Sequence, residues 1–232
     1  DYHMIPYRAG CSVPPELATV TKKRFQLGLL DDEALAAITE EEAPQAVLFW
    51  DEQLAGATGY VDWVKRHYVL GYKHNYHEIY VPLAQRVPQP EQQAATLGGM
   101  VELVGYAVPD PAVLPGEALE VLLLWRAKQP VATRLTGFVH LVSAEGQAIA
   151  GQDQLAWGEQ YPSTSWHVGE TVVDRYLLRV PSDSPPGRYA LSVGLYDAET
   201  KRRLDAVDAS GGKLEGDQVT LGLWPVVQAP SA

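Results

Sequence analysis

The sequence predicts an α+β protein in which a small α/β domain at the N-terminus is followed by an all-β, immunoglobulin-like sandwich. Residues 12–83 alternate between helical and extended hydrophobic patterns, which is typical of units that mix helices with strands. Beyond residue 96 the helical pattern stops, and strand-like segments follow that are separated by turns. We therefore expect an α/β domain over 1–86, a linker over 87–96, the sandwich over 97–228 and a disordered tail over 229–232.

The N-terminal domain shows both kinds of element. The expected elements are a strand over 16–23, a helix over 31–43, a strand over 45–50, a helix over 59–67 and a hairpin around the turn "HNYH". The first helix has the clearest boundaries, because Asp31 can cap its start and Pro44 ends it. Carboxylates in its first turn suit the positive end of the helix dipole.

The second half of the chain contains the strands of the predicted sandwich. They are expected over 101–108, 119–127, 135–144, 172–180, 188–197 and 217–227. The strand over 188–197 has the sharpest start, since Pro185 and Pro186 cannot lie in a central strand and Gly187 permits a turn. Apolar residues then occupy every second position, which indicates a half-buried strand.

Charge and composition exclude several classes of protein. The 232 residues carry 18 Lys and Arg against 29 Asp and Glu, a net charge of −11, so no basic surface for nucleic acid is expected. Cys11 is the single cysteine, which excludes an intramolecular disulfide. No apolar run reaches the ~20 residues of a membrane span. The chain does not start with methionine, and we expect it to be part of a longer polypeptide.

No spaced catalytic motif is present, so the candidate sites rest on clusters of suitable side chains. Trp157, Tyr161 and Trp166 lie in a turn-rich segment. They could stack on the apolar face of a sugar, anchor a partner protein, or instead close the end of the sandwich. Loop carboxylates could hold calcium, since hard cations prefer oxygen ligands. The candidate calcium ligands are Asp205, Asp208, Glu215 and Asp217. No other cofactor is expected.

Several segments of the sequence resemble a known protein family. "VPPELATVTKKRFQLGLLDDEALAAI", "PQAVLFW" and "VDWVKRHYVLGYKHNYHEIYV" resemble the region after the last membrane span in bacterial membrane glycosyltransferases. These belong to the dolichyl-phosphate-mannose–protein mannosyltransferase class, with its aminoarabinose-transferase-like relatives. "LPGEALEVLLLWRA", "YPSTSWHVGETVVDRYLL" and "PPGRYALSVGLYD" look like the β-domain at the C-terminus of some bacterial members. The resemblance covers about residues 12–226 and concerns turns and strands.

The resemblance implies a location and a partner but no catalytic residue. That family spans the membrane several times, uses a polyprenyl-phosphate sugar donor and adds sugar outside the cytoplasmic membrane. Its catalytic acid lies in the first external loop, which has no counterpart in this sequence. The resemblance therefore implies a domain on the extracytoplasmic face of the cytoplasmic membrane, joined to the membrane-embedded part of the same polypeptide.

Three functions follow from these observations. The first is a non-catalytic domain of a membrane glycosyltransferase that assists binding of a saccharide or a protein acceptor. The second is a structural or protein-interaction β-sandwich. The third is an independent glycoside hydrolase, which would need two carboxylates held roughly 5–10 Å apart. The first is the interpretation that the sequence favours.

Overall fold

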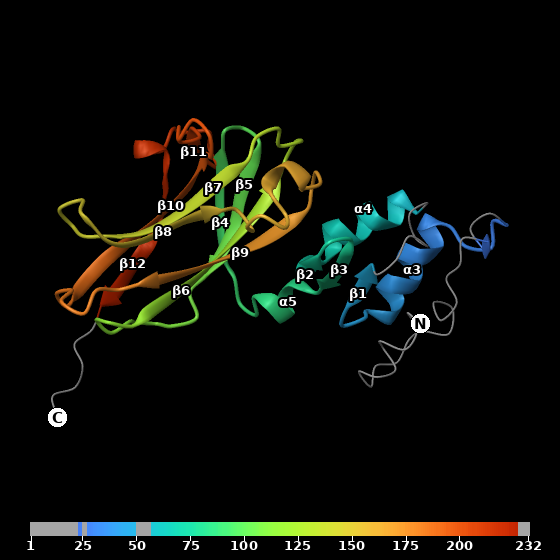
Figure 1. Cartoon of the computed structure of the whole chain (residues 1–232), viewed down its shortest axis with the longest axis horizontal. Coiled ribbons are helices and arrows are strands. Elements are labelled where there is room, and N and C mark those ends of the chain that lie inside the picture. The colour runs from blue at the N-terminus through green and yellow to red at the C-terminus, as the bar shows by residue number, and fades with distance from the viewer. Residues whose placement is uncertain (1–22, 25–26, 50–56, 227–232) are drawn as a thin grey trace, which may run out of the picture. The chain divides into compact units, whose positions relative to one another are not determined.

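The computed structural model describes residues 23–24, 27–49 and 57–226 (Figure 1). The chain divides into two compact units, Asp1–Arg86 and Val87–Ala232. Cys11, residues 16–22 of the first expected strand, and the tail expected over 229–232 lie outside the described residues.

The first unit combines helices with a small antiparallel sheet. Its elements are α3 (Asp32–Glu42), β1 (Val47–Phe49), α4 (Thr58–His67), β2 (Val69–His74), β3 (His77–Val81) and α5 (Leu83–Arg86). The strands pair in the order β1-β3-β2 and all run antiparallel. The expected helices over 31–43 and 59–67 correspond to α3 and α4, and the expected hairpin is the pair β2 and β3.

The residues that predicted the ends of α3 have the expected roles in the structure. The Asp31 side chain accepts a hydrogen bond of 2.8 Å from the backbone N–H of Ala34, which satisfies one free donor of the first turn. Ala43 ends the helix in a left-handed conformation with φ of 40°, directly before Pro44. Leu35 and Thr39 form the buried side of the helix.

The second unit is a β-sandwich built from two antiparallel sheets (Figure 1). One sheet has the order β12-β10-β7-β8 and the other has the order β11-β4-β5-β6-β9. The strands are β4 (Glu91–Leu97), β5 (Val101–Ala107), β6 (Ala118–Ala127), β7 (Leu135–Val142), β8 (Ala148–Leu155), β9 (Thr171–Arg179), β10 (Gly187–Asp197), β11 (Ala206–Asp208) and β12 (Val219–Val226). Two short 3₁₀ helices, η2 (Ser163–Ser165) and η3 (Glu215–Asp217), lie between strands.

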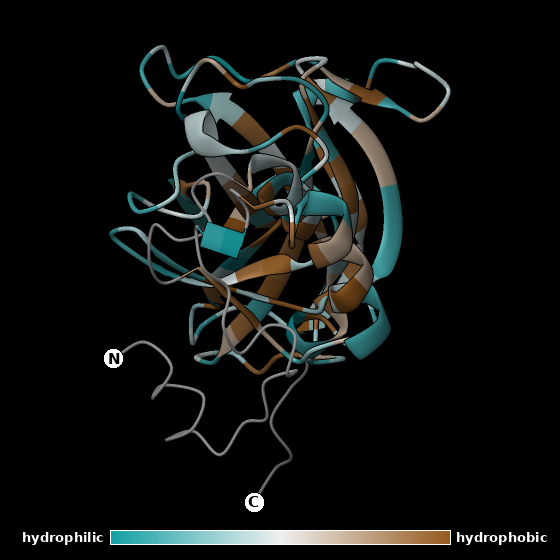
Figure 2. Ribbon diagram, turned by 90° about the vertical axis from the view of Figure 1, so that its right-hand side faces the viewer, coloured by the Kyte–Doolittle hydropathy of each residue, from teal (hydrophilic) through white to brown (hydrophobic). Residues whose placement is uncertain are grey.

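The core of the sandwich comes from alternating residues of these strands. On β10 the side chains of Tyr189, Leu191, Val193 and Leu195 are all at most 6% exposed, as the alternation predicted. The strand is not half-buried, however, because Ser192 on its other face is 2% exposed. Trp125 of β6 is fully buried in the same unit. Figure 2 shows that the hydrophobic stretches follow the strands, whereas the turns are mostly hydrophilic. Burial of these alternating apolar side chains is the main favourable contribution to this fold.

The prediction of a linker over 87–96 is wrong for most of that range. Residues Glu91–Leu97 form β4, which pairs with β5 on one side and β11 on the other. Two prolines and a polar composition suggested a linker, but both prolines precede the strand and do not interrupt its hydrogen bonds. Ala95 and Leu97 supply the buried positions of β4.

No helix within the described ranges is long and apolar enough to cross a lipid bilayer.

Candidate functional site

The candidate site is a groove of about 450 Å³ at one edge of the sandwich. It lies where β4 and β11 of the five-stranded sheet come close to η3 and to the start of β12, which belongs to the four-stranded sheet. Its lining residues are Gln93, Asp208, Leu214, Glu215, Gly216, Gln218, Val219 and Thr220. Asp208, Glu215 and Thr220 are exposed. Gln93 and Gln218 are partly buried, and Val219 is buried.

A tight turn shapes one wall of the groove. The Oδ1 atom of Asp208 accepts hydrogen bonds from the backbone N–H groups of Ser210 and Gly212, at 2.8 and 2.9 Å. It also accepts one from the Ser210 hydroxyl at 2.6 Å. The Ser210 hydroxyl and these N–H groups hold the pKa of Asp208 below its usual range. The carboxylate therefore stays ionised and its position is fixed by the backbone.

Arg203 holds two other residues of the lining. Its Nη1 atom donates to the backbone oxygen of Gly216 at 2.8 Å and to Oε1 of Gln218 at 3.0 Å. The guanidinium also lies over the ring of Phe138, 4.5 Å from its centroid. Gly216 has a φ of 68°, which glycine adopts without a steric penalty. Arg203 thus holds both η3 and the amide of Gln218 in place.

The structure does not bring the four candidate calcium ligands together into one group. Lys213 lies between two of the proposed ligands, with its Nζ atom 3.3 Å from Asp205 and 3.5 Å from Asp217. The ammonium group of Lys213 therefore balances part of the charge of these two carboxylates. Across the described ranges, no three His, Cys, Asp or Glu side chains are grouped so that they could hold a metal ion. Of the four candidates, Asp208 and Glu215 instead line the groove.

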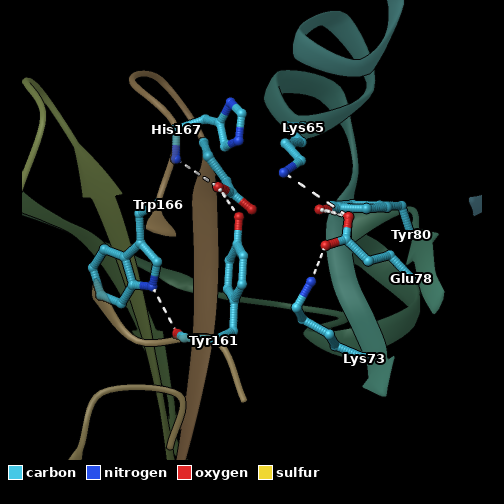
Figure 3. Close-up of polar contacts among 8 residues, drawn as sticks. Lys65, Lys73, Glu78, Tyr80, Tyr161, Trp166 and His167 are labelled. Atoms are coloured by element: carbon cyan, nitrogen blue, oxygen red, sulfur yellow. Dashed lines mark hydrogen bonds and ion pairs between the residues drawn. The ribbon is translucent and has the colours of Figure 1, made fainter. Parts of the chain in front are cut away.

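Two of the three candidate aromatic residues are buried. Tyr161 is 2% exposed and Trp166 is 5% exposed, so neither ring can stack on a sugar. The Tyr161 hydroxyl donates to Oε2 of the buried Glu170 at 2.7 Å, and the same oxygen accepts the backbone N–H of His167 at 2.9 Å. Trp166 donates its Nε1–H to the backbone oxygen of Tyr161 at 3.3 Å (Figure 3). Both rings are therefore packed inside the protein.

Trp157 is partly exposed, yet its backbone is fixed by the interior. It has a φ of 58°, and its N–H donates to Asp174 at 3.2 Å. Its ring meets that of Tyr161 edge to face, with 6.0 Å between centroids. It does not belong to the lining of the groove.

A buried carboxylate, Asp174 on β9, joins the two sheets. It is 2% exposed and accepts hydrogen bonds from the Tyr176 hydroxyl at 2.6 Å and from Gln154 of β8 at 3.0 Å. Burial raises the pKa of Asp174 to about 6, although these donors and the Trp157 N–H favour the ionised form. Because this acid is enclosed, we interpret it as a structural group.

The first unit contains a separate charged cluster on its sheet. Glu78 forms ion pairs with Lys73 and with Lys65, the latter at 3.9 Å, and accepts the Tyr80 hydroxyl at 3.0 Å (Figure 3). Burial alone would raise the pKa of Glu78, but the hydrogen bond from Lys73 and the two lysine charges lower it overall. Lys65 also lies over the Tyr80 ring at 5.9 Å. The cluster ties α4 to the hairpin.

Sequence reasoning did not identify the glutamines of the groove. Gln93 fell in the segment expected to be a linker, and Gln218 fell at the start of the last strand. Neither belongs to a spaced motif. Ala95 and Leu97 alternate as buried positions of β4, but the register shifts between Gln92 and Ala95, so this alternation does not extend to Gln93.

No protein-family model matches the chain, and no curated protein matches it. Among solved structures it is similar to the C-terminal domain of wzt, with 13% identity, a TM-score of 0.39, and coverage of 62% of this chain and 84% of that one. It is also similar to the CARDB domain of the PF1109 protein from Pyrococcus furiosus, solved with di-metal ions, with 16% identity, a TM-score of 0.32, and coverage of 59% and 97%. A Niemann-Pick type C2 protein from the Japanese carpenter ant has 8% identity, a TM-score of 0.28, and coverage of 60% and 92%. Likenesses this distant assign neither a family nor a function.

Proposed function

We propose that this chain is a non-catalytic domain that binds a saccharide for a bacterial membrane glycosyltransferase, on the extracytoplasmic face of the cytoplasmic membrane. The observation that carries the binding role is the polar groove between β4, β11 and β12. The connection to a glycosyltransferase rests on the sequence phrases over about residues 12–226.

The chemistry of the groove suits a ligand rich in hydroxyl groups. Gln93 and Gln218 offer amide groups, and Asp208 and Glu215 offer carboxylate oxygens that accept from hydroxyls. Leu214 and Val219 add apolar surface beside them. A sugar ring combines hydroxyl groups with C–H faces, so it can use both kinds of contact. Binding sites for small ligands combine apolar surface with a few placed polar groups in the same way.

The carboxylates favour binding over hydrolysis. A glycoside hydrolase needs one carboxylic acid with a raised pKa to protonate the leaving group. In the groove, Asp208 has a lowered pKa because Ser210 and Gly212 donate to it. The acid whose pKa is raised, Asp174, is enclosed between the sheets and does not line the groove.

The proposed partner is the membrane-embedded part of the same polypeptide. In this proposal the donor sugar and the catalytic acid belong to that part, and the groove holds the acceptor or the growing saccharide. The reading frame upstream of Asp1 tests this directly. We expect it to encode several apolar spans. A start codon at this position, preceded by a stop codon, would contradict the membrane attachment without affecting saccharide binding.

Binding is tested by titrating the full chain with neutral oligosaccharides in a calorimeter. We expect Gln218→Ala to weaken any detected binding about tenfold, because it removes a groove amide worth about 1–1.5 kcal/mol. Gln147→Ala is the matched control, since Gln147 is an exposed glutamine outside the groove. Equal weakening by both variants would refute the groove as the site. Turnover of a glycan or a lipid-linked sugar by the isolated chain would contradict a non-catalytic role.

A further inference from the structure

The groove carries negative charge and no positive charge among its lining side chains. Asp208 and Glu215 are the charged residues of the lining, and the remaining polar side chains are Gln93, Gln218 and Thr220. A polar groove without a cation has no group that could balance the charge of an anionic ligand. A groove with this composition should discriminate between ligands by their charge.

The two cations close to the groove are already used by the protein. Arg203 donates to Gly216 and Gln218 and covers the Phe138 ring. Lys213 is paired with Asp205 and Asp217. Both cations therefore have partners within the protein, those of Lys213 at its surface, and neither is among the lining residues.

The orientation of Gln218 follows from its contact with Arg203. A guanidinium only donates hydrogen bonds, so the amide oxygen of Gln218 must face it. The NH₂ group of the amide is then available to donate to a ligand oxygen. Beside it, the carboxylates accept from ligand hydroxyls. Neighbouring hydroxyls on a sugar can satisfy a donor and an acceptor at once, whereas a ligand carboxylate or sulfate would only suit the donor.

We propose that the groove selects neutral saccharides over anionic ones and that Glu215 is a residue that determines this specificity. The inference rests on the proposed saccharide-binding function. Glu215 is exposed at the rim on η3, so removing its charge changes the groove without disturbing the core. Asp208 is a less suitable position for the test, because its carboxylate also holds the turn to Gly212.

The experiment uses a printed array of neutral, carboxylated and sulfated oligosaccharides, probed with the labelled full chain. Wild type is compared with Glu215→Gln and with the control Glu199→Gln, which removes an exposed carboxylate outside the groove. Thermal melts of all three proteins verify folding. For Glu215→Gln we expect the ratio of anionic to neutral glycan signal to rise about tenfold, since one like charge is removed from a partly solvated site.

The possible outcomes separate the two proposals. Neutral glycans bound by wild type, with a raised ratio for Glu215→Gln alone, would support the inference. Preferential binding of anionic glycans by wild type, or the same ratio in both variants, would overturn the inference and leave saccharide binding intact. Binding to no glycan by any of the three folded proteins would overturn the proposed function and this inference with it.

Discussion

The side chain of Gln154 on β8 donates a hydrogen bond of 3.0 Å to the carboxylate of Asp174 on β9, and the two strands belong to different sheets. A neighbouring glutamine extends this connection, because Oε1 of Gln152 accepts the backbone N–H of Leu177 at 2.7 Å. Gln154 also donates to the backbone oxygen of Arg175 at 2.9 Å. One side of the sandwich is thus joined by side chains where no strand pairing connects the sheets.

Asp174 should make stability depend on pH. Its pKa is about 6 in the folded chain, against an ordinary value of 3.8, so the folded state binds the proton more tightly than the unfolded state. The stabilisation from this group is fully present below about pH 4 and is lost as the pH rises through about 6. The difference between a pKa of 3.8 and one of about 6 corresponds to about 3 kcal/mol of stability.

Urea denaturation of wild type and Asp174→Asn between pH 4 and pH 8 measures this effect. The stability of the variant relative to wild type should rise by about 3 kcal/mol from the acidic to the neutral end, since the amide does not titrate. A carboxyl NMR titration of Asp174 with a midpoint near 4 would show that burial does not raise its pKa.

Tyr161→Phe should affect stability and leave saccharide binding unchanged. The substitution removes the hydroxyl that donates to the buried Glu170, which costs about 1–3 kcal/mol when an enclosed carboxylate loses a donor. Chemical denaturation measures the loss, with Tyr76→Phe as a control at a tyrosine that is 68% exposed. If Tyr161→Phe abolished glycan binding while stability stayed the same, a ligand role for this ring would have to be reconsidered.

Arg203→Lys should weaken ligand binding and lower stability by about 1 kcal/mol. Lysine keeps the charge but cannot hold Gly216 and Gln218 with one planar group, nor stack flat on Phe138. Calorimetric titration and thermal melts measure the two effects. Arg202→Lys changes the exposed neighbouring arginine and should match wild type in both. Identical behaviour of the two variants would contradict the positioning role.

Gly137→Ala should destabilise the sandwich by about 1–3 kcal/mol. A methyl group at position 137 of β7 would meet the hydroxyl of Tyr176, which is itself fully buried and bonded to Asp174. Gly187→Ala is the control, because a methyl group there makes only an ordinary contact of 3.5 Å with Tyr189. Differential scanning calorimetry should separate the two variants, and equal melting temperatures would disprove the steric argument.

Sequence patterns predicted those helices and strands in which the order of apolar and polar residues determines the buried face. Asp31 and Pro44 marked the ends of α3, and the alternation along β10 identified the buried side chains of one face, because caps and periodicity act within a few residues. The polar, proline-preceded start of β4 carried no such pattern, so the strand was missed. Glu91–Leu97 forms a strand because it pairs with β5 and β11.

The groove could not be predicted because its residues come from distant parts of the chain. Gln93 and Gln218 meet only after the two sheets have formed, and no spacing rule links them. The burial of Tyr161 and Trp166 depends on contacts with Glu170 and the segment around it, which composition does not reveal. The acidic residues near 205–217 suggested calcium, but the sequence could not show that Lys213 pairs with Asp205 and Asp217.

The hydroxyl of Tyr106 on β5 lies 2.8 Å from the backbone oxygen of Leu221 on β12, one residue beyond the groove lining. It also lies 2.6 Å from Glu91 at the start of β4. This anchor fixes the spacing of the two sheets next to the groove before any ligand arrives. The groove is therefore expected to be preformed, and its structures with and without a bound ligand should superimpose closely.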